Sequence, residues 1–335
     1  MQNESASHFV RRSVLRAAGA LAISAFLFAP QTASAQSKYP DKPIRFVVPF
    51  AAGGATDITA RILSELLAKS LGQQVIVENR PGAGSNLGAA VVARAAPDGY
   101  TFLVGSSGII ASPALYDNLT YDVMKDLVPV AELVGTTNVF ISKPGNGFDS
   151  VADIVKKARA GQKLSYAHPG VGTTPHLAME LLKLREKLDI TSVPYGGAAP
   201  ASTAILGGSV EIGSMALANV HPQVKAGQFK GVAVTSVKRW HDLPDVPTVL
   251  ESGQKDFDLE TIFLMMAPAG TPQEIIDRVA KESITILKRP EVVERVKKLG
   301  FEVLARGPDV LKARIVKEVP LYKDIVIKAG IPKVK

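Results

Sequence analysis

IRFVVPFAAGGATDITARILSELLAKSLGQQVIVENRPGAGSNLGAAVVARAAPDGYTFLV, residues 44–104, determines the fold class that we expect. It contains three short, largely apolar runs, at residues 44–48, 74–78 and 100–104, and each run predicts a buried strand. Apolar residues at helical spacing follow the first run and stop at Gly72, and an alanine-rich segment after the second run predicts another helix. Strand, helix, strand, helix, strand is typical of an α/β sheet with parallel pairing and right-handed crossovers.

A second α/β series begins near Val139. Ser150, with an aspartate three residues later, predicts a helix start, and Gly161 predicts the end of that helix. Further elements are expected as strands at 164–166, 191–193 and 232–235 and as a helix at 199–206. Because no long flexible linker separates the two series, we expect two α/β units that share a close interface.

The C-terminal part contains a helix start of its own. Thr271 is followed by proline and then, three residues after the threonine, by Glu274. Threonine as N-cap, proline at the first helical position and glutamate at the third form a capping box. This pattern predicts a helix that runs to about Lys288.

The N-terminal segment, residues 1–35, has the form of a signal peptide. Arginines precede a 13-residue apolar run at 17–29, and the small residues of 33–35 provide a cleavage site. The run is shorter than the roughly 20 apolar residues that cross a bilayer. Arg11 and Arg12 also have twin-arginine form, so Sec and Tat export both stay open. We therefore expect a periplasmic protein.

The composition limits the function further. A chain of 335 residues suggests two domains, and 46% hydrophobic residues suffice for a buried core. There is no cysteine, which excludes disulfides, thiolate nucleophiles, iron–sulfur clusters and Cys-ligated zinc. The net charge of +8 is spread along the chain, whereas nucleic-acid binding needs a clustered basic stripe. The charge suits a small anionic ligand.

Four loops that follow strand ends are rich in glycine and hydroxyl residues. Each is expected to place backbone N–H groups at a helix N-terminus, where about half a positive charge is concentrated. Such loops can hold a carboxylate without formal cations, although a tight strand–helix turn is the alternative interpretation of any one of them. The four loops lie at residues 51–57, 105–108, 170–174 and 195–198.

Catalytic patterns are weak by comparison. The glycines of 82–88 resemble a dinucleotide fingerprint, but the third glycine stands one place too late. No Gly-x-Ser-x-Gly or His-Glu-x-x-His pattern occurs in the sequence. His176, just inside a helix opened by residues 173–175, is either an anion donor or an ordinary helix-face histidine. We expect a binding protein without cofactor or metal, and the alternative is a periplasmic hydrolase or lyase that acts on a carboxylated molecule.

An ordered set of motifs points to a family. The motifs are YPDKPIR at 39–45, VPF at 48–50, GGATD at 53–57, VENRPGAG at 77–84, APDGYT at 96–101, VPY at 193–195, LPDVPT at 243–248 and APAGTP at 267–272. With them the chain resembles the Bug (TctC-like) solute-binding proteins of tripartite tricarboxylate transport systems. The resemblance extends from about residue 39 to residue 331.

The resemblance implies a type II-like periplasmic binding protein with two α/β lobes, each a mixed or parallel sheet flanked by helices, around a ligand cleft. The first lobe is expected to be discontinuous, at 36–139 plus 258–335, and the second to span 140–257. The implied partners are a small di- or tricarboxylate or aromatic carboxylate and either TctA/TctB-like membrane subunits or a sensor kinase. A monomer is expected, with no nucleic acid.

The loops and the resemblance together predict the binding residues. They are Phe50, Ala52, Gly53, Gly54, Thr56, Asp57, Ser106, Ser107, Gly172, Thr173, Thr174, His176, Tyr195, Gly196, Gly197 and Met215, with Phe50 and Met215 implied by the resemblance alone. Asp57 is expected to cap a helix or order water, because a bare carboxylate repels the ligand. Many family members carry aspartate at the position of Met215, a lysine is frequent at that of Gly196, and Ser-Ala is common where this chain has His168 and proline. These departures favour an aliphatic or aromatic carboxylate over an amino acid.

Overall fold

The computed structural model describes residues 39–334, and the predicted signal peptide lies outside the described residues. None of the helices in this range has the length and apolar content needed to cross a bilayer. The strands are β1 (Ile44–Val48), β2 (Val75–Asn79), β3 (Thr101–Ser106), β4 (Leu127–Ser142), β5 (Leu164–His168), β6 (Ile190–Pro194), β7 (Ile212–Ala216), β8 (Lys230–Val234), β9 (Glu260–Pro268) and β10 (Glu302–Arg306). The helices are α2 (Ala55–Leu71), the 3₁₀ turn η1 (Ala83–Ser85), α3 (Asn86–Ala93), α4 (Gly108–Leu115), α5 (Val151–Arg159), α6 (Thr174–Glu186), α7 (Ala198–Leu206), α8 (Leu217–Lys225), α9 (Gln273–Leu287), α10 (Pro290–Lys298) and α11 (Pro308–Lys328).

The first sheet has the strand order β2-β1-β3-β9-β4, and β10 pairs with β4. β1 is parallel to both β2 and β3, which confirms the pairing expected for residues 44–104. β9 and β10, which the sequence did not reveal, are antiparallel to their neighbours. The left-handed conformation of Gly72, with φ of 70°, ends α2 as predicted.

The second sheet has the order β4-β7-β5-β6, with β8 also paired to β4. β5 is parallel to β6 and β7, and β4 is antiparallel to β7 and β8. This sheet contains the strands predicted at 164–166, 191–193 and 232–235, each with slightly different bounds. The carboxyl ends of β5 and β6 therefore point the same way, so the loops that follow them are neighbours.

β4 belongs to both sheets and changes partners near its middle. Up to Thr137 it pairs with β9, and from Asn138 onward it pairs with β7. The buried side chain of Asn138 donates from Nδ2 to the Leu259 carbonyl at 2.7 Å and accepts from Thr261 Oγ1 at 2.7 Å. This change of partner lies close to the predicted lobe boundary at residue 139.

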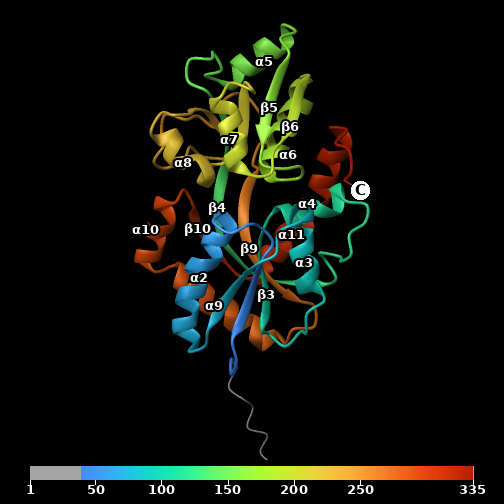
Figure 1. Cartoon of the computed structure of the whole chain (residues 1–335), viewed down its shortest axis with the longest axis vertical. Helices are drawn as coiled ribbons and strands as arrows, with labels where there is room; N and C mark the ends of the chain where they lie inside the picture. The colour runs from blue at the N-terminus through green and yellow to red at the C-terminus, as the bar shows by residue number, and fades with distance from the viewer. Residues whose placement is uncertain (1–38, 335) are drawn as a thin grey trace, which may run out of the picture. The chain divides into compact units, whose positions relative to one another are not determined.

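Helices cover both faces of the first sheet, as Figure 1 shows for α2, α9 and α10 on one side and α3, α4 and α11 on the other. The alternation of side chains along the strands explains the two layers, because Phe46 and Phe102 contact the first group whereas Val47 and Leu103 contact the second. Full burial of one such side chain contributes roughly 1.5–3 kcal/mol.

Two predicted helix starts had different outcomes. The hydroxyl of Ser150 accepts the Asp153 N–H at 3.1 Å, which confirms that cap. The capping box at Thr271 is wrong, because its hydroxyl instead donates back to the Pro268 carbonyl at 2.8 Å. Helix α9 nevertheless forms, with Pro272 at its N-cap position.

Candidate functional site

The loop after β1 is fastened by Asp57, the third residue of α2. Its Oδ2 accepts the Gly53 N–H and Arg61 Nε, both at 2.9 Å, and its Oδ1 accepts Asn79 Nδ2 at 3.0 Å. Burial raises the pKa of Asp57, but the hydrogen bonds from Arg61, Gly53 and Asn79 outweigh that effect and lower the pKa. Asp57 therefore holds the loop in place through the Gly53 N–H, whereas no side chain caps the N-terminus of α2 at Gly54. The predicted helix cap is thus wrong, and the alternative role of Asp57 in ordering water stays a prediction.

The same loop exposes Ala52, Gly53 and Gly54, whereas Thr56 is buried. The first N–H groups of α2, at residues 55–57, have no partner within the helix because of the geometry of any helix start. Asn79 also donates to the Phe50 carbonyl at 3.0 Å, which turns the start of the loop toward β2. An exposed glycine loop thus leads into a helix N-terminus.

The loop after β3 is tied to β9. Ser107 donates its N–H to the Ile262 carbonyl at 2.9 Å, and its Oγ accepts the Ile262 N–H at 3.3 Å. Ser106 is the last residue of β3 and lies opposite Phe263. Ser107 is fully buried and Ser106 is 9% exposed, so Ser106 is the more accessible of the two hydroxyl residues.

The loop after β5 contacts elements of both sheets. A Cβ on Gly172 would overlap the side chain of Leu115 in α4, and φ of +80° independently favours glycine there. Thr174 shares a buried hydrogen bond with Thr261 of β9. Within the loop, Thr173 Oγ1 donates to the Gly170 carbonyl at 2.8 Å. These contacts place the loop beside the end of α4 and the start of β9.

His176 is buried behind this loop in its neutral form. Burial lowers its pKa to about 4, assisted by the positive charge of Lys183. Its Nδ1 accepts the Gly172 N–H at 3.2 Å, so the ring proton stands on Nε2. No residue of the range 39–334 accepts a hydrogen bond from Nε2. Within that range, some side-chain polar atoms are both fully buried and without a partner, and Nε2 of His176 is not one of them. Nε2 therefore offers a donor that solvent can reach.

The loop after β6 lies next to the loop after β5. Tyr195 donates its N–H to the His168 carbonyl at 3.0 Å, and its own carbonyl lies 3.9 Å from the Cβ position of Gly170. Gly196 is exposed and Gly197 is half-buried. Met215, in contrast, is fully buried among core side chains of the second sheet, so its contact with a ligand stays a prediction.

The predicted residues thus form a series of neighbouring loops. β1 pairs with β3, β3 with β9, and β9 carries the partners of both Ser107 and Thr174. The loop after β6 joins the series through His168. This arrangement gathers backbone donors and hydroxyl groups, which can bind an oxygen anion.

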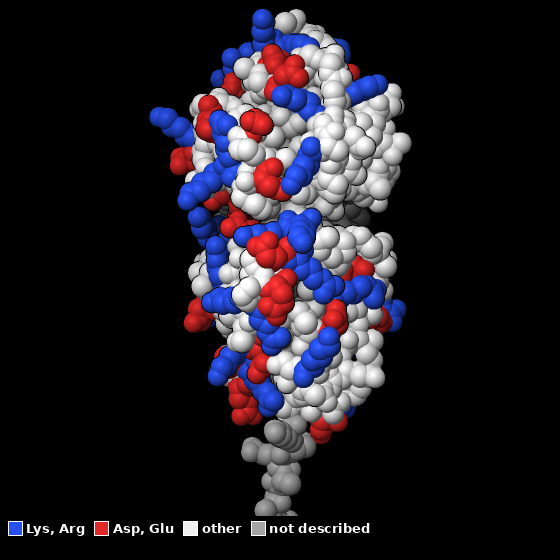
Figure 2. All heavy atoms as spheres, turned by 90° about the vertical axis from the view of Figure 1, so that its left-hand side faces the viewer, with Lys and Arg blue, Asp and Glu red and all other residues white. Residues whose placement is uncertain are grey.

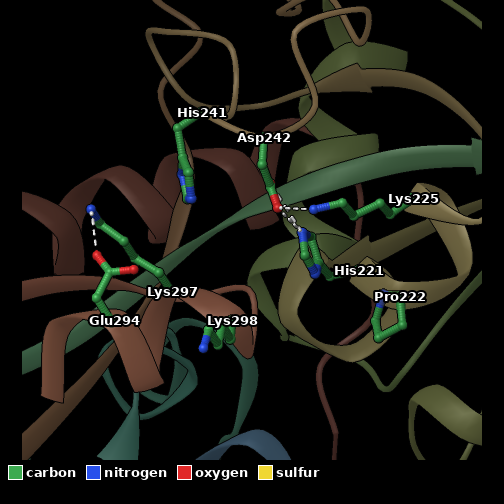
Figure 3. Close-up of a pocket in the computed structure, with 8 residues that line it drawn as sticks. All are labelled: His221, Pro222, Lys225, His241, Asp242, Glu294, Lys297 and Lys298. Atoms are coloured by element: carbon green, nitrogen blue, oxygen red, sulfur yellow. Dashed lines mark hydrogen bonds and ion pairs between the residues drawn. The ribbon is translucent and has the colours of Figure 1, made fainter. Parts of the chain in front are cut away.

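A cavity of about 450 Å³ lies elsewhere, between α8, the segment at His241 and α10, and contains none of the predicted residues (Figure 3). Its charges are largely paired: Asp242 binds His221 and Lys225, each at 3.0 Å, and Lys297 lies 3.6 Å from a glutamate. Both signs of charge are also interspersed over this face of the molecule (Figure 2). The paired charges make this cavity a weaker anion site than the loops.

Comparison with known proteins identifies the family. The family described as "Tripartite tricarboxylate transporter family receptor", TctC, matches residues 59–331. The chain belongs to the TctC family. Among its relatives, BugT of Bordetella pertussis is 34% identical over 296 residues, which cover 87% of this chain and 90% of BugT.

Solved structures of TctC-like proteins share the fold. The periplasmic binding protein BugD is 36% identical, with a TM-score of 0.80 over 88% of this chain and 100% of BugD. A Rhodopseudomonas palustris protein solved with adipate is 32% identical, with a TM-score of 0.82 over 88% of this chain and 100% of that chain. The fold is thus the two-lobed α/β fold of periplasmic binding proteins, as predicted.

The residues that hold these loops in shape are not evident from the sequence pattern. Arg61 stands four residues after Asp57 on the same helix face, a spacing that was available as a signal. Asn79 lies on another element, and no local pattern links it to Asp57. His168 was noted only as a departure from the family, and its contacts with the loop after β5 required the structure.

Proposed function

We propose that this chain is a periplasmic receptor that binds a small carboxylate in the cleft between its lobes and closes over it. The observation that carries the proposal is the loop after β5, where the start of α6 and the Nε2–H of His176 offer donors. These groups are neutral, yet a helix N-terminus attracts an anion. A neutral donor set binds a carboxylate without the cost of burying a lysine or arginine.

The site includes the sixteen predicted residues, which come from both sheets. We place the first lobe at 36–139 plus 258–335 and the second at 140–257, because β4 changes its partners near residue 138. Rotation of the two sheets about this stretch brings the loops after β1 and β3 toward those after β5 and β6. Such hinge closure around a ligand is a common motion of binding proteins.

A dicarboxylate is the favoured solute, with tricarboxylates and aromatic carboxylates as further members of the class. The related protein solved with adipate supports this choice, because adipate carries two carboxylates on an aliphatic chain. The loops after β1 and after β5, each of which leads into a helix N-terminus, are expected to hold one of the carboxylates together. Met215 and Gly196 provide no charged partner for an ammonium group, so amino acids are expected to bind weakly.

Delivery of the solute to TctA/TctB-like membrane subunits is the proposed role of the closed form, since the family is a receptor family of such transporters. Presentation to a sensor kinase uses the same closure. We expect a monomer that is exported to the periplasm by the predicted signal peptide, residues 1–35.

The test is a thermal-shift panel with the mature chain from Gln36. The panel contains adipate, malate, citrate and benzoate, each beside its methyl ester. A ligand at 100 times its Kd stabilises the native state by about 2.7 kcal/mol, which raises Tm by a few degrees. We expect a selective response to one class of acid and none to the esters, because the ester removes the anion that the loops bind.

Two results contradict the proposal. One is an unchanged Tm for every acid after the protein has been unfolded and refolded to remove any co-purified solute. The other is conversion of an added acid, detected by mass spectrometry of the supernatant, which would favour the hydrolase or lyase alternative. Gly54→Val serves as the matched variant, because it is expected to keep the fold and lose the response.

A further inference from the structure

His168, the last residue of β5, is fully buried beside the loop that follows it. Its Nδ1 lies 2.9 Å from the Gly170 carbonyl oxygen, and its Nε2 lies 3.0 Å from Ser192 Oγ. Both ring nitrogens therefore have partners, one in the loop and one on β6. No other buried histidine in the described range links a strand of the second sheet to this loop in that way.

The distances assign the ring proton of His168. A carbonyl oxygen only accepts, so a lone pair on Nδ1 would face the lone pairs of Gly170 at 2.9 Å and be repelled. Nδ1 therefore carries the proton and donates it to Gly170, and Nε2 accepts from the Ser192 hydroxyl. The longer approach of the Gly170 N–H to Nδ1, at 3.3 Å, is then not a hydrogen bond.

The contact fixes one peptide unit of the loop. The Gly170 carbonyl also accepts from Thr173 Oγ1 at 2.8 Å and from the Thr173 N–H at 3.3 Å. The bond from Gly170 to Val171 is trans, so the carbonyl and the N–H of that unit point in opposite directions. Since His168 and Thr173 hold the carbonyl, the Val171 N–H points away from them, and no residue of the described part accepts it.

His168 also stacks on His176, with 4.3 Å between ring centroids and 28° between planes. The two neutral rings have opposite protonation: His168 donates from Nδ1 to a carbonyl, whereas His176 accepts at Nδ1 from the Gly172 N–H. Each ring thus holds one glycine of the loop. The stack keeps the His176 ring in the orientation that leaves its Nε2–H unpaired.

We propose that His168 is the positioning residue of this loop: it holds the Gly170 carbonyl inward and so directs the Val171 N–H toward the bound carboxylate. The inference rests on the proposed function and adds two residues, His168 and Val171, to the site. Val171 donates from its backbone, and His168 acts through the loop without touching the solute.

The first arm of the test needs no ligand. In uniformly ¹⁵N-labelled protein, the imidazole ¹⁵N shifts are expected to show His168 protonated at Nδ1 and His176 at Nε2. Ser192→Ala removes the donor to Nε2 without touching the loop and is expected to leave His168 protonated at Nδ1, because the Gly170 carbonyl fixes the proton. The Val171 amide proton is expected to exchange with solvent faster than that of Gly172.

The second arm compares two substitutions that preserve different halves of the imidazole. The amide of His168→Asn reaches the position of Nδ1 and can still donate to Gly170, whereas that of His168→Gln reaches the position of Nε2 and keeps only the Ser192 contact. With adipate and malate as probes in calorimetry, we expect Kd within about threefold of the parent for Asn and at least tenfold weaker for Gln. The Val171 amide shift is expected to follow the same order.

Three results overturn the inference: protonation of His168 at Nε2 in the parent protein, equal losses in the Asn and Gln variants, or no loss in either. If neither probe binds the parent, the proposed solute class is wrong, and the imidazole and Val171 shifts of the variants still decide whether His168 positions the loop. The two failures are therefore distinguishable.

Discussion

The loops after β1 and after β5 both lead into a helix N-terminus, yet different chemistry holds them. Asp57 fastens the first loop with a charged network that includes Arg61 and Asn79. The second is held by two stacked neutral imidazoles, His168 and His176. The difference shows that similar backbone donors can be presented either by an ionised group at a loop edge or by uncharged rings within the core.

The distinction matters because the two supports respond to different conditions. The side chain of Asp57 is buried, while its partner Arg61 is 54% exposed and reaches solvent. The imidazoles lose nearly all hydration on folding, and burial lowers the pKa of His168 to about 3, assisted by the neighbouring His176. A change in pH should therefore affect the stability of the second loop before that of the first.

The largest expected effect is a loss of stability on acidification. Both histidines titrate near pH 6.5 in the unfolded chain and at about 3 and about 4 in the folded protein. Between pH 6.5 and 4 the unfolded chain binds more protons than the folded protein, so the free energy of unfolding decreases as the pH is lowered. The loss reaches roughly 2–3 kcal/mol for each histidine, at about 1.4 kcal/mol per pKa unit.

Urea denaturation of the parent and of His168→Asn at pH 7, 5.5 and 4 measures this slope. The variant should show a shallower slope because one titrating ring is gone. Asp57 does not contribute in this window: its pKa is lowered, so its stabilising contribution is present above about pH 3.9 and is lost only at lower pH. Equal slopes for parent and variant would mean that His168 is not the group being protonated.

The next effect is expected from Asp57→Ala. The substitution removes the charged acceptor of the Gly53 N–H and of Asn79 Nδ2, although Asn79 keeps its bond to the Phe50 carbonyl and the exposed Gly53 can be hydrated. The loss of these hydrogen bonds to a charged group is expected to cost roughly 2 kcal/mol. Chemical denaturation should show this loss. Arg61→Ala is the matched control, because an exposed partner contributes less than about 1 kcal/mol. A larger loss of unfolding free energy for Arg61→Ala than for Asp57→Ala would mean that Arg61, and not Asp57, holds the loop.

The smallest effect concerns the donors of the first loop. Gly54 has φ of −80°, and the nearest atom to an added Cβ is the Ala51 carbonyl oxygen at 3.7 Å, so Gly54→Val fits the fold. Its side chain blocks the approach to the loop, and we expect at least a tenfold weaker carboxylate Kd, about 1.4 kcal/mol.

Gly53→Val sharpens this comparison. Gly53 has φ of +84°, so the valine adds backbone strain of about 1–2 kcal/mol to any loss of binding. Calorimetry of the two variants measures the loss of carboxylate affinity caused by the blocked loop, and denaturation measures the loss of stability caused by backbone strain. Unchanged affinity in Gly54→Val would remove the first loop from the site.

Local signals predicted much of the fold. The start of α5 at Ser150 and the end of α2 at Gly72 depend on residues within one or two turns, so the sequence pattern sufficed. The length of β4 and the existence of β9 depend on pairing between distant segments, which leaves no periodic mark in fully buried strands. Thr271 failed as a cap because a nearby carbonyl competed for its hydroxyl.

The candidate site, too, was predictable from the sequence only where it depends on local residues. Glycine and hydroxyl residues after strand ends indicated which loops to consider, because the carboxyl ends of parallel strands are a usual place for ligands. The supports of those loops were not predictable, since Asn79 and Ser192 lie on strands other than those that precede the loops they hold. Whether Met215 reaches a ligand stays a prediction, because the structure buries it.

The shared strand β4 also sets the order in which a nascent chain can assemble. The second half of β4 finds all its partners, β7 and β8, before residue 235, whereas the first half pairs with β9 and β10, which are synthesised last. The second sheet can therefore form while the first still lacks β9, the strand between β3 and β4, although the first sheet contains the first strands of the chain. A stalled ribosome or a C-terminal truncation before β9 would leave the apolar edge of β4 open to aggregation.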